Sequence, residues 1–209
     1  MILQRSIVLR DMIKNVIFDF GCVLVNWDQH NLYDAHFGSK EKTDWFIDNV
    51  CTWEWNNQTD MGKSFAVAVE EKIAEHPEWE KEIRMYWERW EEMIGGDVPG
   101  MKEWLGELKG AGYKLYGLSN WSHETFPLVK DKYEVFRLLD GIVMSGYELV
   151  AKPDLRIYER LLERYGLKAE ECVFIDDRKE NVEAGEKVGI RGIVFENCEQ
   201  AKDIFNQMK

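Results

Sequence analysis

The sequence has few cysteines, and no C-x-x-C pair occurs among them. Cys22 and Cys172 lie in or beside apolar runs, where a free thiol behaves as a small hydrophobic side chain. This usage argues against a disulfide framework and is typical of a reducing compartment. We therefore expect a cytoplasmic protein.

An excess of basic residues is also missing, since 27 lysines and arginines stand against 39 aspartates and glutamates. The formal net charge of −12 argues against a nucleic-acid partner, because binding a phosphate backbone requires a basic face. An anionic small molecule can still bind where local cations and a metal ion outweigh the overall negative charge.

No run approaches the roughly 18 uninterrupted apolar residues of a membrane span, so we expect no membrane partner. The first ten residues are mildly apolar, but Gln4, Arg5 and Ser6 interrupt them and no small-residue cleavage site follows. We expect residues 1–11 to be a short N-terminal extension, with Met12 as an alternative start of the protein.

Short β-rich apolar runs alternate with helical periodicity, a pattern typical of a parallel sheet covered by helices. The predicted strands are Asn15–Asp19, Lys114–Ser119, Gly141–Met144, Cys172–Asp176 and Gly192–Phe195. The predicted helices are Met101–Ala111, Glu124–Lys130, Arg156–Tyr165 and Asn181–Val188. The expected fold class is α/β, a Rossmann-like parallel sheet with helices on both faces.

The segment from residue 28 to residue 95 differs, because it is rich in Trp and Glu and lacks strand-like runs. Its spacing favours helices, one of them over Trp79–Met93. We predict a helical cap here, inserted into a catalytic core formed by residues 12–27 and 96–209. We expect Trp27 to line the substrate entrance and the six tryptophans of the cap to pack its own core; these six are Trp45, Trp53, Trp55, Trp79, Trp87 and Trp90.

Polar side chains follow four of the predicted strands at the edge where ligands bind in open α/β sheets. These residues are Asp19, Ser119 with Asn120, Lys152, and Asp176 with Asp177. Three carboxylates, a lysine and a hydroxyl at one edge predict a catalytic site.

Asp19 is suited to be a nucleophile, because a rigid strand holds it beside a glycine turn that lets a substrate approach. If it attacks a phosphate, two anions meet and a hard cation is needed, for which Asp19 and Asp177 suit Mg²⁺. We expect Lys152, Ser119 and the backbone near Asn120 to hold the phosphoryl oxygens.

The order of these motifs resembles that of the haloacid dehalogenase-like hydrolases over roughly residues 13–195. The motif Asp-Phe-Gly-x-Val-Leu together with Leu-Ser-Asn is similar to a sugar-phosphate phosphatase subgroup of that superfamily. The resemblance implies that the Gly21 carbonyl binds the metal. It also implies that Asp177, four residues before Asn181, is a metal ligand and that Asp176 orients Lys152.

Gly21 departs from the typical phosphatases of this family, in which a second Asp stands here and protonates the leaving oxygen. Losing a general acid typically costs about 10²–10⁴-fold in rate. Three explanations stay open: a leaving group that needs little help, a proton from a cap residue or water, or carbon–halogen cleavage, which needs no proton donor.

The sequence thus predicts a magnesium-dependent phosphatase of a small phosphorylated metabolite, a sugar phosphate, working through an aspartyl-phosphate as a monomer or homodimer. One alternative is a 2-haloacid dehalogenase with Asp19 as nucleophile, in which Arg84 or Arg89 would grip the substrate carboxylate. The other is a catalytically weak binding protein of the same fold, which only Gly21 supports.

Overall fold

Five parallel strands form the central sheet of the computed structural model, which describes residues 13–209. Their spatial order is β5-β4-β1-β6-β7, and every neighbouring pair is parallel. The strands are β1 (Asn15–Phe18), β4 (Lys114–Ser119), β5 (Gly141–Met144), β6 (Cys172–Asp176) and β7 (Arg191–Val194). The predicted α/β fold with a Rossmann-like parallel sheet is confirmed. The expected extension over residues 1–11, and Met12, lie outside the described residues.

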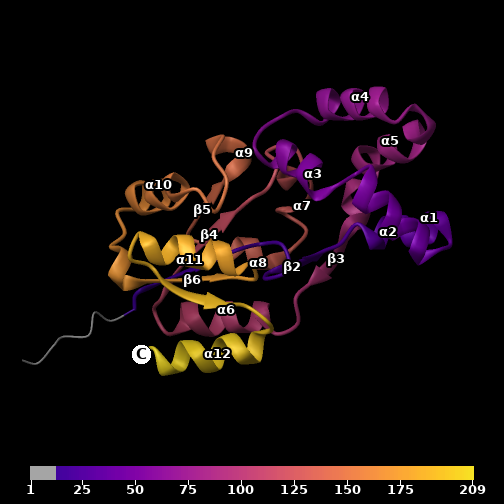
Figure 1. Ribbon diagram of the computed structural model, residues 1–209. Helices are drawn as coiled ribbons and strands as arrows, with labels where there is room; N and C mark the ends of the chain where they lie inside the picture. The colour runs from indigo at the N-terminus through magenta and orange to yellow at the C-terminus, as the bar shows by residue number, and fades with distance from the viewer. Residues whose placement is uncertain (1–12) are drawn as a thin grey trace, which may run out of the picture.

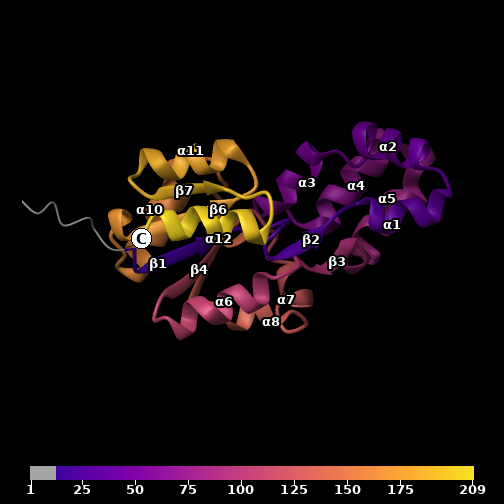
Figure 2. The same ribbon diagram turned by 90° about the horizontal axis from the view of Figure 1, so that it is seen from below.

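Helices cover both faces of this sheet (Figures 1 and 2). The helices α6 (Met101–Gly110) and α12 (Cys198–Gln207) pack on one face, together with the side chains of β1 that alternate with Ile17. The helices α10 (Leu155–Tyr165) and α11 (Lys179–Lys187) pack on the other face, against Ile17. Because the inner strands β1 and β6 are buried on both faces, their sequences are almost continuously apolar, which is why these strands could be located.

Three further short helices lie near the carboxyl ends of the strands. Two of them connect β4 to β5, and the third follows β5. They are α7 (Phe126–Val129), α8 (Glu134–Arg137) and α9 (Ser145–Glu148), and a 3₁₀ turn, Ala169–Glu171, precedes β6. Three of the predicted strands have the observed bounds, while the first ends one residue earlier and the last is shifted by one residue, so that Asp19 lies just after β1. The ladder nevertheless continues through it, since the Asp19 amide donates to the Ile175 carbonyl at 2.9 Å.

A second, two-stranded antiparallel sheet was not predicted. It pairs β2 (Val25–Trp27) with β3 (Ile94–Asp97), and Val25 lies opposite Asp97. These strands are too short to show alternation, and two glycines, Gly95 and Gly96, interrupt the apolar pattern of β3. This pairing brings the two ends of the intervening helical segment together.

The segment between β2 and β3 is helical and lies to one side of the central sheet, as the indigo-to-magenta ribbons of Figures 1 and 2 show. It contains α1 (His30–Phe37), α2 (Lys40–Asn49), α3 (Trp53–Asp60), α4 (Phe65–Glu75) and α5 (Glu80–Glu88), with 3₁₀ turns at Pro77–Trp79 and Trp90–Met93. The prediction of one helix over Trp79–Met93 is wrong, because the chain turns after α5 to bury Trp90 and Met93. Its role as a cap stays a prediction.

The expected core of tryptophans is found only in part. Trp55 and Trp90 are buried, and Trp79 and Trp87 pack partly buried against the hydrophobic core. The prediction is wrong for Trp45 and Trp53, whose exposed fractions are 48% and 42%. Among residues 13–209, no helix combines the length and apolar character needed to cross a membrane.

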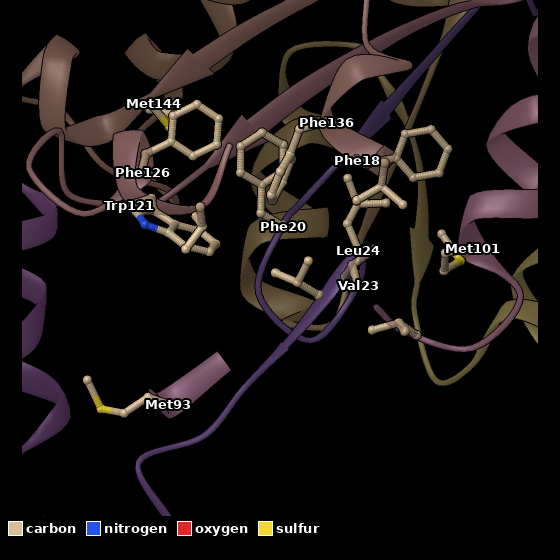
Figure 3. Close-up of a cluster of buried hydrophobic side chains, with 14 of the residues drawn as sticks. Phe18, Phe20, Val23, Leu24, Met93, Met101, Trp121, Phe126, Phe136 and Met144 are labelled. Carbon is tan, nitrogen blue, oxygen red and sulfur yellow. The ribbon is translucent and has the colours of Figure 1, made fainter. Parts of the chain in front are cut away.

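An aromatic cluster supports the loop that follows β1 (Figure 3). The Phe20 ring lies 4.9 Å from Phe136 and 5.6 Å from Phe126, measured between ring centroids. Gly117 in β4 makes room for Phe20, because a Cβ there would stand 2.4 Å from its ring. Packing on the side of Phe20 therefore fixes the backbone that carries Asp19.

Candidate active site

The carboxyl ends of β1, β4 and β6 meet at one edge of the sheet, and a cavity of about 440 Å³ opens there. Because β1 is central and β4 and β6 are its neighbours, residues more than 150 positions apart become adjacent. All the predicted site residues except Asp176 line this cavity: Asp19, Gly21, Trp27, Ser119, Asn120, Lys152 and Asp177. The structure thus brings the four motifs together.

Lys152 is the buried cation of the site. Its Nζ lies 2.8 Å from Asp19 Oδ1 and 2.7 Å from Asp176 Oδ2, and it donates to the Leu118 carbonyl at 2.8 Å. Its side chain is 1% exposed. Burial by itself would lower the pKa of Lys152, but the carboxylates of Asp176 and Asp19 outweigh this effect and raise it. The ammonium group therefore stays charged.

Asp19 is held less firmly as an anion. Burial raises the pKa of its carboxyl to about 7, while Lys152 acts in the opposite direction. The ammonium is shared between two carboxylates, so it compensates the burial of Asp19 only in part. A further positive charge near Asp19 would keep it ionised.

Asp176 already has partners for both of its oxygens. Besides Lys152, Asn181 Nδ2 donates to Oδ1 and Oδ2 at 3.0 and 3.1 Å, and the Arg178 amide donates to Oδ1 at 2.8 Å. The residue is fully buried. Asp176 is thus placed to position Lys152 rather than to bind a metal.

The acidic cluster fits a divalent metal. Carboxylate oxygens of Asp19, Asp176 and Asp177 all lie within 4.8 Å of one another. Since Asp176 is engaged elsewhere, Asp19 and the exposed Asp177 are the carboxylates available, with Gly21 beside them in the cavity wall. Burial and the neighbouring Asp176 raise the pKa of Asp177 in the absence of a cation. Hard oxygen donors that repel one another suit Mg²⁺.

Asn120 and Ser119 have different positions at the end of β4. The side chain of Asn120 clamps the backbone of Lys152, accepting from its amide at 2.8 Å and donating to its carbonyl at 2.9 Å. Its side chain is therefore occupied in placing Lys152. The buried Ser119 lines the cavity.

Sequence analysis missed most of the opposite wall of the cavity. Trp53, Trp90 and Trp121 line it together with Trp27, and so do Cys22, Asn56, Asp60, Arg178 and Asn181. The indole of Trp53 contacts Trp27 at 6.2 Å between ring centroids, and the guanidinium of Arg178 lies 5.1 Å from the Trp53 ring. Trp53, Asn56, Asp60 and Trp90 carry no local sequence signal, because only the path of the helical segment brings them to the strand ends. Cys22, Trp121 and Arg178 instead directly follow predicted site residues, and Asn181 already belonged to the fourth motif.

The fold is an α/β fold with a parallel sheet, and its acidic, lysine-containing cavity at the strand ends is where enzymes of this fold class bind their ligands. Residues 13–189 match the family of haloacid dehalogenase-like hydrolases, and the chain belongs to this family. Its similarity extends to a sesquiterpene phosphatase of Aspergillus oryzae, with 31% identity over 186 residues, covering 86% of this chain and 88% of the relative.

Solved structures share the fold. A haloacid dehalogenase family enzyme of Bacteroides thetaiotaomicron, crystallised with magnesium and inorganic phosphate, is 21% identical with a TM-score of 0.71, covering 92% of this chain and 99% of that one. The L-2-haloacid dehalogenase of Xanthobacter autotrophicus is 16% identical with a TM-score of 0.63, covering 93% and 83%. The fold is therefore shared by a family enzyme crystallised with magnesium and phosphate and by a dehalogenase.

Proposed function

We propose that the protein is a magnesium-dependent phosphatase that hydrolyses a small organic phosphomonoester through an aspartyl-phosphate on Asp19. The observation that carries this proposal is the placement of Asp19, which faces an open cavity beside a buried lysine and a second, unengaged carboxylate, Asp177. A metal bound by Asp19, Asp177 and the Gly21 carbonyl would supply positive charge between the carboxylates and the phosphate.

The two oxygens of Asp19 have different surroundings. Oδ1 lies beside Lys152 Nζ and accepts from the Phe20 amide at 2.6 Å. No protein donor to Oδ2 is recorded within residues 13–209. Oδ2 is therefore the oxygen that attacks phosphorus, forming the Asp19–phosphorus bond as the bond to the leaving oxygen breaks. Water then attacks the same phosphorus and releases phosphate and the free carboxylate.

The dehalogenase alternative lacks its expected cation. Arg84 pairs with Glu70 and Glu80, Arg89 pairs with Glu92, and neither arginine lines the cavity. The available Asp177 also favours phosphate chemistry, since dehalogenation needs no metal ligand.

The sugar phosphate predicted from sequence stays a prediction. The cavity wall favours a second candidate class of substrate. The indoles of Trp27, Trp53, Trp90 and Trp121 form much of the wall facing the phosphate end of the cavity. Such a wall favours an apolar or aromatic organic group, which gains from leaving water. The name of the Aspergillus relative points in the same direction.

A substrate panel tests the proposed function. We expect phosphate release from phosphomonoesters in the presence of Mg²⁺, little release after chelation, and no halide release from 2-chloro acids. Phenethyl phosphate and sugar phosphates in the same panel compare the two substrate classes. Halide release that is independent of metal would establish the dehalogenase instead, and inactivity on both groups of compounds would favour the binding protein.

A further inference from the structure

The cavity has no carboxylic acid at residue 21, the position from which typical relatives protonate the leaving oxygen. Of the described residues that line the cavity, six have ionisable side chains: Asp19, Cys22, Asp60, Lys152, Asp177 and Arg178. Asp19 acts as the nucleophile in the proposed mechanism, and Asp177 as a metal ligand. Four groups are left as possible proton donors.

Three of these four are poorly suited. Lys152 is engaged by two carboxylates, and Arg178 is a guanidinium paired with Glu180, which does not give up a proton. The Cys22 thiol donates to the Trp27 carbonyl at 3.7 Å, and burial raises the pKa of the thiol.

We propose that Asp60, the last residue of α3, is the general acid that donates a proton to the leaving oxygen. This assignment rests on the proposed phosphatase function. It places the proton donor on the helical segment opposite Asp19, rather than two residues after it.

The backbone of Asp60 is fixed to the catalytic side of the molecule. Its carbonyl accepts from Ser145 Oγ, and the same Oγ accepts from the Trp121 amide at 3.0 Å, two residues after Ser119. Gly62, with a φ of 97°, turns the chain directly after α3, where a Cβ would stand 3.3 Å from the Gly146 carbonyl. Asp60 is therefore held against the loop after β4, close to the phosphate end of the cavity.

A buried hydrogen-bond chain orients the carboxyl group. Gln29 Nε2 donates to the Tyr86 hydroxyl at 3.3 Å, and this hydroxyl donates to Asn56 Oδ1 at 2.7 Å. The amide of Asn56 therefore turns its Nδ2 toward Asp60 and donates to Oδ2 at 2.8 Å. This chain fixes the orientation of the carboxyl group, because Oδ2 is held by the Asn56 amide.

The surroundings favour the protonated form. Burial raises the pKa of Asp60 to about 8; Asp19 contributes in the same direction, while hydrogen bonds from the Ser122 backbone and Asn56 oppose it. Asp19 is the charged group that acts on Asp60, and burial raises the pKa of the nearby Tyr86 hydroxyl well above its usual value, so that hydroxyl stays neutral. No ion pair to Asp60 is recorded for the described part of the chain. At neutral pH the group is a carboxylic acid with a proton to give.

The proton can complete a cycle. As the bond between phosphorus and the leaving oxygen breaks, that oxygen takes the proton from the Asp60 carboxyl group and leaves as an alcohol. Asp60 is then a carboxylate when water attacks the aspartyl-phosphate, and it accepts a proton from that water. Phosphate and the neutral acid are regenerated without any other reactant.

Asp60→Asn tests this role with two substrates that differ in their need for a proton. The first substrate is an unactivated ester: phenethyl phosphate, or glucose 6-phosphate if the protein prefers sugars. Its turnover should fall by about 10²–10⁴-fold. Turnover of para-nitrophenyl phosphate, whose leaving group departs as a stable anion, should fall far less. The matched control is Glu54→Gln, which removes a charge from the exposed side of the same helix and should affect neither substrate.

A rescue variant and a pH profile complete the test. A Cβ at Gly21 would meet no atom within 4 Å, so Gly21→Asp has room to add a carboxyl group and should restore turnover of the unactivated ester in the Asp60→Asn background. Activity on that ester should fall as the pH rises through about 8 in the parent protein, and Asp60→Asn should lack this decline.

The outcomes separate the two proposals. Equal losses on both substrates, with no rescue, would show that Asp60 only supports the structure and would overturn its role as proton donor. An unmutated protein that hydrolyses neither phosphomonoester with Mg²⁺ would refute the proposed function itself.

Discussion

Asp19→Asn is expected to abolish phosphomonoester turnover while the fold stays intact. An amide cannot form the aspartyl-phosphate, and removal of a covalent nucleophile lowers kcat by on the order of 10⁴–10⁶-fold. The substitution is close to isosteric, and Lys152 keeps Asp176 as its second partner at 2.7 Å. Steady-state kinetics and thermal unfolding measure the two parts of this prediction.

Asp203→Asn is the matched control for this variant. Asp203 lies on α12, where its side chain is exposed. It is not among the residues that line the cavity. The control should keep both turnover and stability. If Asp19→Asn kept substantial turnover, phosphorus would be attacked by some other group, and covalent catalysis by Asp19 would be ruled out.

Lys152→Met should abolish activity and also destabilise the protein strongly. The side chains of Lys152 and Asp176 are 1% and 0% exposed, so the methionine would leave two buried carboxylates facing each other without a cation. Removing one partner of a buried ion pair typically costs about 3–5 kcal/mol in the free energy of unfolding. Denaturant unfolding of a protein stripped of metal measures this loss.

The loss in Lys152→Met should depend on pH. Lys152 lowers the pKa of Asp19, so its removal raises that pKa further above the value of the unfolded chain, about 4. A carboxyl group with a raised folded pKa binds its proton more tightly in the folded state, and the protein loses stability as the pH rises above the unfolded pKa. The stability of the variant should therefore be closest to that of the parent protein at pH 4–5, and the loss of stability should be largest above neutral pH.

Lys179→Met provides the control for the lost charge. Lys179 begins α11 near the site, but its side chain is 77% exposed and, within residues 13–209, its recorded ion pair is with Glu183 at 3.4 Å. Such a surface change should alter stability by no more than about 0.5 kcal/mol. Equal stability of the Lys152 and Lys179 variants would contradict the arrangement of the buried ion pairs.

The catalytic edge could be predicted from sequence because its signals are local. A strand buried on both faces is a continuous apolar run, and the polar residue that ends it is visible by contrast, as at Asp19 and Asp176. The order of parallel strands then brings these ends together. The contacts of Lys152 with both carboxylates are a consequence of that order, even though the sequence places them far apart.

The opposite wall could not be predicted, because its members share no local pattern. Trp53 and Asp60 belong to a polar helix whose sequence resembles a solvated surface, and Trp90 comes from a 3₁₀ turn expected to continue a helix. Each reaches the cavity through the path of residues 28–95 over the strand ends. The cytoplasmic location, the monomeric or homodimeric state and the boundaries of the cap stay predictions.

Trapping the phosphorylated protein tests the central proposal most directly. The protein would be mixed with radiolabelled para-nitrophenyl phosphate and Mg²⁺, quenched in acid within the first turnover, and mapped by mass spectrometry. We predict an acid-stable, base-labile phosphoryl group on Asp19 that does not form in Asp19→Asn. Rapid phosphate release with no label on this residue, or a label on another side chain, would contradict the proposed mechanism.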